Sequence, residues 1–183
     1  MLKRKTTQFS MHLLLLLVVF VFTGCSYESP AEAINNGWSG EIKVNDVLSR
    51  QKTDDGTIVL FTAQDVDKSE KFKKLGFALV TGQNDKSWEF IFSTMIAMTD
   101  DSFSARHNVF HYETEKGNVQ EMPIAFGILK NENIASVTAE VKNEKKEIEI
   151  LSTKSGRYFY QVNAWGPIKF LDENGEVIDR YGT

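Results

Sequence analysis

The sequence predicts a mainly β fold, an antiparallel sandwich or partly open barrel with at most one or two short helices. Three observations support this prediction. Short runs of β-branched and aromatic residues recur along the chain, turn-forming residues separate them, and the 3.6-residue periodicity of an amphipathic helix is hard to find. About ten short strands at such spacing are typical of a sandwich or barrel. With 183 residues, of which 42% are hydrophobic, the chain is long enough for one domain with its own core.

The N-terminal segment has the pattern of an export signal. Three basic residues precede ten consecutive apolar residues at positions 13–22. A transmembrane helix needs about 20 apolar residues, and Ser10 and His12 interrupt the apolar run on its N-terminal side. We therefore expect a signal peptide over residues 1–24 rather than a permanent membrane span.

The apolar run ends in Phe22-Thr23-Gly24-Cys25, which resembles the lipobox of bacterial lipoproteins. The resemblance implies that Gly24 is the small residue before the cleavage site and that Cys25, linked to a diacylglycerol, becomes the mature N-terminus. Phe22 departs from the family pattern, which prefers Leu, Val or Ile at that position. The alternatives are ordinary secretory cleavage nearby and an uncleaved anchor. Acylated Cys25 would place the protein at the cell membrane, on its extracytoplasmic face.

The charge balance argues against two classes of partner. Without residues 1–24 the chain has 18 Lys and Arg residues against 25 Asp and Glu residues. An anionic lipid surface repels such a domain, so we expect the acyl chains on Cys25, rather than a basic patch, to hold it at the membrane. Nucleic acid is disfavoured for the same reason. Cys25 is the one cysteine of the chain, which excludes a disulfide scaffold.

The segment after the signal is rich in Ser, Pro, Ala, Asn and Gly. Pro30 and Asn35-Asn36-Gly37 oppose regular structure, so we expect a flexible tether over residues 25–40. Trp38, within this segment, either docks onto the domain or stays loose. The sequence contains no internal repeat and no second linker, so we expect one monomeric domain over residues 41–183.

Within this domain the sequence predicts eleven strands separated by turn signals. These are residues 41–47, 57–62, 76–80, 87–98, 103–112, 123–129, 136–141, 147–151, 158–162, 168–171 and 176–178. Alternate residues from Trp88 to Met98 are apolar, which predicts one buried strand face. Asn174-Gly175 predicts a hairpin closed by a type I′ turn. The main helical candidate is the charged segment 64–74, with a solvated loop as the alternative.

The pattern of the domain itself also resembles a group of proteins. Phe126-Gly127-Ile128-Leu129, Tyr158-Phe159-Tyr160 and the hairpin from Leu171 to Ile178 look like those of small uncharacterised lipoproteins of Gram-positive bacteria. This resemblance covers hairpin and core residues and implies no activity.

Two histidines have the spacing of metal ligands. His107 and His111 are four residues apart, which on a helix places both on one face, as in a zinc site. The segment looks extended, however, and on a strand the two are about 13 Å apart, at about 3.3 Å per residue, too far to share an ion. We therefore predict no metal at this pair.

Acidic residues cluster at four places in predicted turns. They are Asp54-Asp55, Asp65 with Asp67, Asp100-Asp101 and Asp172-Glu173. A calcium loop of the EF-hand type beginning at Asp172 would require Gly where the chain has Val177. We interpret these carboxylates as turn-forming and solvated, and predict no cofactor. The alternative is a calcium site assembled from separate loops.

No motif singles out a catalytic residue. The sequence lacks a Gly-x-Ser-x-Gly elbow, and its one cysteine is assigned to the lipid, so serine and cysteine nucleophile schemes have no support. Trp88, Tyr158, Phe159 and Tyr160 are expected in core and hairpin packing. Trp165, which precedes Gly166-Pro167, is less easily buried and is the candidate binding residue.

These observations favour a non-catalytic binding module at the cell envelope. We expect a membrane-anchored extracytoplasmic lipoprotein that binds an envelope protein, peptide or glycan through loops or a sheet edge. The alternative is a hydrolase of envelope polymers, whose paired carboxylates are brought together by the fold rather than by sequence spacing.

Overall fold

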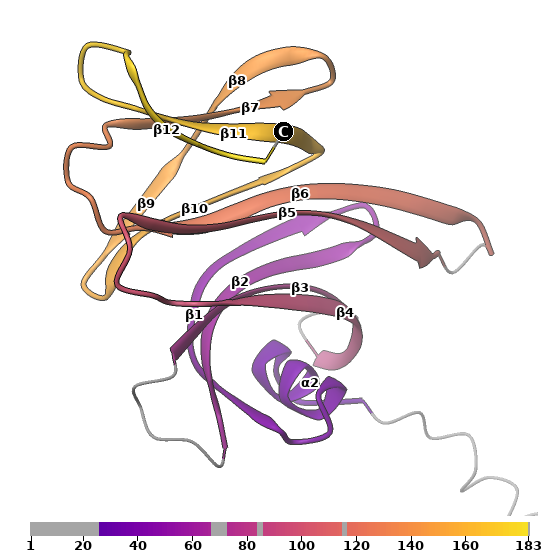
Figure 1. Cartoon of the computed structure of the whole chain (residues 1–183). Coiled ribbons are helices and arrows are strands. Elements are labelled where there is room, and N and C mark those ends of the chain that lie inside the picture. The colour runs from indigo at the N-terminus through magenta and orange to yellow at the C-terminus, as the bar shows by residue number, and fades with distance from the viewer. Residues whose placement is uncertain (1–25, 67–72, 84–85, 115–116, 183) are drawn as a thin grey trace, which may run out of the picture.

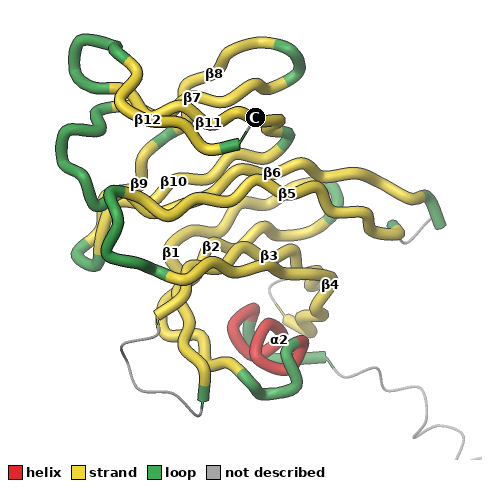
Figure 2. The backbone as a smooth tube through the Cα atoms, in the orientation of Figure 1, coloured by secondary structure: helices red, strands yellow, loops and turns green. Residues whose placement is uncertain are grey.

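Four stacked layers make up the part of the chain that the structure describes (Figures 1 and 2). The computed structural model describes residues 26–66, 73–83, 86–114 and 117–182. One short helix covers the outer face of a first antiparallel sheet, a second sheet packs on its inner face, and a third sheet packs on the second. The predicted mainly β sandwich is thereby confirmed. Among the described residues no helix is long and apolar enough to cross a membrane.

Each sheet has four strands. The first has the order β1-β2-β3-β4, the second β5-β6-β10-β9 and the third β12-β11-β7-β8. The elements are α2 (Pro30–Gly37), β1 (Ile42–Thr53), β2 (Gly56–Asp65), β3 (Lys73–Gln83), β4 (Lys86–Ala97), β5 (Phe103–Glu113), β6 (Val119–Leu129), β7 (Ser136–Val141), β8 (Glu144–Ile148), β9 (Ile150–Thr153), β10 (Gly156–Val162), β11 (Ala164–Leu171) and β12 (Val177–Tyr181).

The first sheet is buried on both faces at its centre. In β2, Ile58 and Leu60 pack toward the second sheet, whereas Val59 and Phe61 pack toward α2. All four side chains are at most 1% exposed. A strand covered on both sides needs a continuous apolar run rather than alternation, which is what this segment provides.

The second sheet is likewise covered on both sides. Phe126 of β6 meets Phe77 of the first sheet, with ring centroids 5.9 Å apart. On the opposite face, Phe159 of β10 meets Phe170 of the third sheet at the same centroid distance. The hydrophobic core therefore consists of three layers of side chains, one in each space between neighbouring layers of the fold.

At two places the chain passes directly from a strand of one sheet into a strand of the next. The single strand predicted over 147–151 is in fact β8 and β9, which pair with β7 in the third sheet and β10 in the second. Asn163, with φ of 58°, separates β10 in the second sheet from β11 in the third. Strands that change sheets in this way form the corner of a sandwich.

The predicted tether over residues 25–40 is wrong where the structure describes it. Ser29 caps the helix α2 by accepting a hydrogen bond from Glu32 N, and Pro30 takes a position in the first turn where its missing N–H costs nothing. Ala33 and Ile34 are fully buried against the first sheet. The apolar face of α2 therefore makes this segment part of the domain.

Polar contacts fix both sides of this helix. Before it, Tyr27 forms an isolated β-bridge with Trp88, and after it the indole N–H of Trp38 donates to Ser93 Oγ. The Asn35 side-chain carbonyl accepts a hydrogen bond from Val44 N at 2.8 Å. Of the two alternatives for Trp38, docking is therefore correct.

A register irregularity divides the predicted apolar face of β4. Leu79 pairs with Phe92 and the next residue of β3 pairs with Phe90, so Ile91 is an extra residue between them. Trp88 and Phe90 consequently pack on the α2 side, whereas Phe92 packs toward the second sheet. The expectation that all these side chains share one face is wrong, because a bulge reverses the alternation.

Two turns also differ from expectation. Gly175 has φ of +82°, but Asn174 does not share a positive φ, and Gly175 N bonds to Asp172 O as in a wider loop. The two-residue type I′ geometry occurs instead between β7 and β8, where Lys142 and Asn143 have φ of 52° and 64°.

The helical candidate over residues 64–74 falls between two strands. Its residues 67–72 lie outside the described residues, and its ends belong to β2 and β3.

A hydrogen bond between side chains joins the first two sheets at their rim. Tyr112 on β5 donates its hydroxyl to Asp55 Oδ2, in the β1–β2 turn, at 2.9 Å. Burial, followed by the hydrogen bond and charge of Asp55, raises the pKa of Tyr112 to about 12. The folded state therefore favours the neutral phenol.

Replacement of Ile34 by Ala should lower the free energy of unfolding by about 2–5 kcal/mol, because it leaves a cavity between α2 and the first sheet. Urea unfolding of a soluble chain that begins at Ser26 measures this. The matched control is Ile178→Ala, at a side chain 41% exposed, which should cost about 0.5 kcal/mol or less. Equal effects of the two substitutions would show that α2 does not belong to the core.

Tyr112 should make stability depend on alkaline pH. Its folded pKa of about 12 lies above the ordinary value of about 10, so its contribution is complete below pH ~10 and is lost as the pH rises toward 12. The stability difference between wild type and Tyr112→Phe should therefore shrink over that interval. The difference in tyrosinate absorbance between the two proteins should titrate near pH 12, and lower in Asp55→Asn. A midpoint near 10 in wild type would contradict the assignment.

Candidate binding site around Trp165

Trp165 is exposed at the start of β11. Its side chain is 43% exposed, whereas Trp88 is 4% exposed and Tyr158 and Phe159 are fully buried. The register between β11 and β7 shifts between Trp165 and Lys169, and such irregularities redirect side chains away from the regular alternation of a strand. The structure thus confirms the sequence-based expectation that Trp165 is the less buried member of this aromatic set.

A histidine from the second sheet lies beside this tryptophan. The rings of His107 and Trp165 are 6.4 Å apart between centroids, at 47°. His107 Nε2 is 3.0 Å from the carbonyl oxygen of Ala164, the residue before Trp165. A contact between β5 and β11 therefore fixes the backbone that presents the indole ring.

An open groove of about 530 Å³ lies next to this segment, at the tip of the β7–β8 hairpin. It is lined by Val141, Lys142, Glu144, Lys145, Lys146, Gln161, Val162 and Asn163. Trp165 is not part of this lining, but it pairs with Glu140, the residue before Val141 of the lining, so the exposed indole lies near the groove at the same end of the third sheet. We call the groove together with Trp165 the distal surface.

Strand pairing explains how the groove forms. Lys146 is paired with Ala139, which is 3% exposed and belongs to the core between the second and third sheets. Lys146 and Glu144 alternate with the outward-facing Lys145, so they share the inner face of the hairpin yet remain exposed. The hairpin tip therefore extends past the apolar core, and polar groups line the space beneath it.

The distal surface carries an excess of positive charge. Three lysines and one glutamate line the groove, in a chain that has more acidic than basic residues. Lys142, Lys145 and Lys146 are exposed, and the ion pairs found among the described residues involve other side chains. The Gln161 amide, in contrast, donates to Val162 O at 2.7 Å.

Sequence reasoning did not find the groove. The predicted strands leave residues 142–146 unassigned, although residues 144–146 begin β8. Asn143 is the residue that indicates the β7–β8 hairpin in the sequence, because Asn tolerates the positive φ that a two-residue hairpin turn requires.

The two histidines have different contacts. Both lie on β5, which confirms the expected extended conformation. His111 is 3.5 Å from the Glu121 carboxylate on the neighbouring strand, and His107 contacts Ala164 instead. Across the part of the chain that the structure describes, no group of three His, Cys, Asp or Glu side chains could hold a metal ion.

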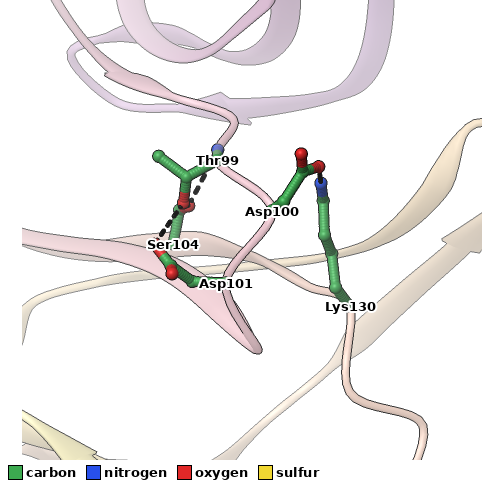
Figure 3. A network of polar contacts seen from close by, with 5 residues as sticks. All are labelled: Thr99, Asp100, Asp101, Ser104 and Lys130. Atoms are coloured by element: carbon green, nitrogen blue, oxygen red, sulfur yellow. Dashed lines mark hydrogen bonds and ion pairs between the residues drawn. The ribbon is translucent and has the colours of Figure 1, made fainter.

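The acidic residues of the β4–β5 connection bind other side chains, as Figure 3 shows. Asp100 binds Lys130 at 2.8 Å, and the hydrogen bond and charge of Lys130 lower the pKa of this carboxyl. Asp101 accepts a hydrogen bond from the hydroxyl of Thr99, whose oxygen is 2.9 Å from Ser104 Oγ. These contacts tie the chain where it passes from the first sheet to the second.

Aspartates of two other acidic clusters also have hydrogen-bond or ion-pair partners. Asp172 Oδ1 accepts hydrogen bonds from Asn174 N and Glu176 N within its own turn. Asp65 pairs with Lys74 on the adjacent strand, and Asp67 lies outside the described residues. The turn-forming interpretation agrees with the contacts of Asp101 and Asp172. Asp55, Asp65 and Asp100 instead bind side chains of other elements.

A second cavity, of about 180 Å³, opens between the first sheet and the β9–β10 turn. It is lined by Asn45, Asp46, Thr62, Gln64, Lys73, Met98, Ser155 and Tyr158. It holds one carboxylate, Asp46, as the groove holds Glu144. Neither of these two cavities of the described structure therefore contains the pair of carboxylates that glycoside hydrolysis uses.

Cys25 and Gly24, the predicted lipidation and cleavage residues, lie outside the described residues. No family model matches the chain, and no curated protein or solved structure matches it either.

Proposed function

We propose that the protein is a lipid-anchored, extracytoplasmic lipoprotein that binds an envelope component through the distal surface, without catalysis. The observation that carries the binding proposal is the exposed Trp165 beside an open groove lined by lysines. The lipobox-like Phe22-Thr23-Gly24-Cys25 after an apolar signal supports the anchor.

The chemistry of the distal surface indicates a ligand class. An indole face packs against sugar rings and against apolar or aromatic peptide side chains. Ammonium groups donate hydrogen bonds to carboxylates and phosphates. A peptide or glycan that carries acidic groups therefore matches both parts of this surface.

Single carboxylates favour binding over hydrolysis. Glu144 in the groove and Asp46 in the second cavity each lack a second carboxylate in the same lining. General acid and base roles at a glycosidic bond need two such groups with different pKa values. The described cavities therefore support a binding module better than the alternative hydrolase.

Replacement of Cys25 by Ala should abolish incorporation of labelled fatty acid and release the domain from the membrane fraction. The reason is that the thiol is the acceptor of the diacylglycerol and no basic patch replaces the acyl chains. Ser26→Ala, at the neighbouring position, is the control and should keep full labelling. Continued labelling of Cys25→Ala would sink the lipobox assignment, and an unlabelled variant that stays in the membrane would identify an uncleaved anchor.

A photo-crosslinking aromatic residue in place of Trp165 should capture an envelope component on intact cells. The same residue in place of Ile178, which is comparably exposed at 41%, is the control and should give little adduct. Charge reversal of Lys145 and Lys146 together should reduce the adduct about tenfold, as expected for two exposed charge contacts of about 0.5–1 kcal/mol each. Equal adducts from both positions would refute the distal surface as the binding site.

A further inference from the structure

We infer that the domain lies on the bilayer in one fixed orientation, with helix α2 toward the lipid and the third sheet directed away from it. This inference rests on the proposed lipid anchor at Cys25. The interaction surface is the outer side of α2 with the start of β4, and the partner is the phospholipid surface itself.

The first step is the short covalent path from the anchor to the folded domain. Ser26 alone separates Cys25 from Tyr27. Tyr27 exchanges two backbone hydrogen bonds with Trp88, both 2.8 Å long. Because consecutive Cα atoms are about 3.8 Å apart, the Cα of an acylated Cys25 lies within about 7.6 Å of the Cα of Tyr27.

The second step is that Tyr27 is held from both sides. Trp88 is 4% exposed and belongs to the core between α2 and the first sheet. After Tyr27, the Glu28 N–H donates to Glu32 Oε2 at 3.0 Å, and buried Pro30 begins the helix. A flexible segment of about 15 residues would instead span about 20 Å and permit any orientation.

The third step is the charge of this surface. Glu28, Glu32 and Glu41 are exposed around α2, and Lys86 and Glu89 are exposed at the start of β4, so carboxylates outnumber ammonium groups on this surface. Anionic lipids do not attract these carboxylates, so the surface has no electrostatic affinity of its own for the bilayer. The orientation follows from the covalent anchor and the Tyr27–Trp88 bridge rather than from a lipid-binding patch.

The fourth step is the arrangement of the layers. In Figure 1, α2 lies on the outer side of the first sheet, and β7, β8, β11 and β12 lie at the opposite end of the stack. Layers that pack face to face are about 10 Å apart, so three such steps place the third sheet about 30 Å farther from the lipid than α2. The distal surface therefore faces away from the membrane.

The test uses the full acylated protein in vesicles of phosphatidylcholine and phosphatidylglycerol. A fluorophore is placed on a single introduced thiol, either Asn36→Cys on α2 or Glu173→Cys in the β11–β12 turn. Cys25 is the one native cysteine, so after its acylation the introduced thiol is the free one. Nitroxide groups on the lipid headgroups quench only nearby fluorophores.

We expect quenching at position 36 to exceed quenching at position 173 at least fivefold. A Gly/Ser insertion of about 15 residues between Cys25 and Ser26 should make the two positions nearly equal, because it removes the short path. Equal quenching without the insertion, in protein that floats with the vesicles, would overturn the fixed orientation alone. Protein that carries no acyl chain and does not float would overturn the anchor, and the orientation with it.

Discussion

At the centre of the first and second sheets neither face meets water, so each face needs another layer to cover it. This requirement determines the rest of the architecture. Ile58, Val59, Leu60 and Phe61 of β2 are buried on alternating sides, so one cover is needed above and one below. The second sheet provides one cover, and α2 provides the other. The second sheet has the same requirement in turn, which the third sheet satisfies through Phe170.

The third sheet ends the stack because only its inner face carries core residues, among them Val137, Ile168 and Phe170. Its strands are short, and the β7–β8 hairpin continues past the core as a polar projection with Lys146 on the inner face. The bend at Asn163 carries the chain from the second sheet into β11 directly beside this projection. The exposed Trp165 and the groove are thus consequences of where the apolar core stops and the chain turns.

Local patterns predicted the strands well, because each apolar run and each Gly- or Asn-containing turn acts within a few residues. The helix α2 was missed although Ser29, Pro30 and Glu32 are good start signals. Pro30 and Asn35-Asn36-Gly37 were interpreted as opposing regular structure, yet Gly37 is needed there because a Cβ would lie 2.4 Å from the Phe90 ring. That contact depends on partners remote in sequence, as do the bulge at Ile91 and the groove lining. The exposure of Trp165, in contrast, follows from its neighbours Gly166-Pro167.

The bridge between Tyr27 and Trp88 also determines how the molecule bears mechanical load. With the proposed anchor at Cys25, a pull on Trp165 would pass through three sheets and reach the anchor through two backbone hydrogen bonds and the packing of one short helix. The bridge has two backbone hydrogen bonds, fewer than the strand ladders within the sheets, so we expect it to part first while the sheets stay intact. Release of residues 26–40 then adds about 50 Å of extended chain, at about 3.3–3.6 Å per residue. Under tension the domain gains a long tether that it lacks at rest.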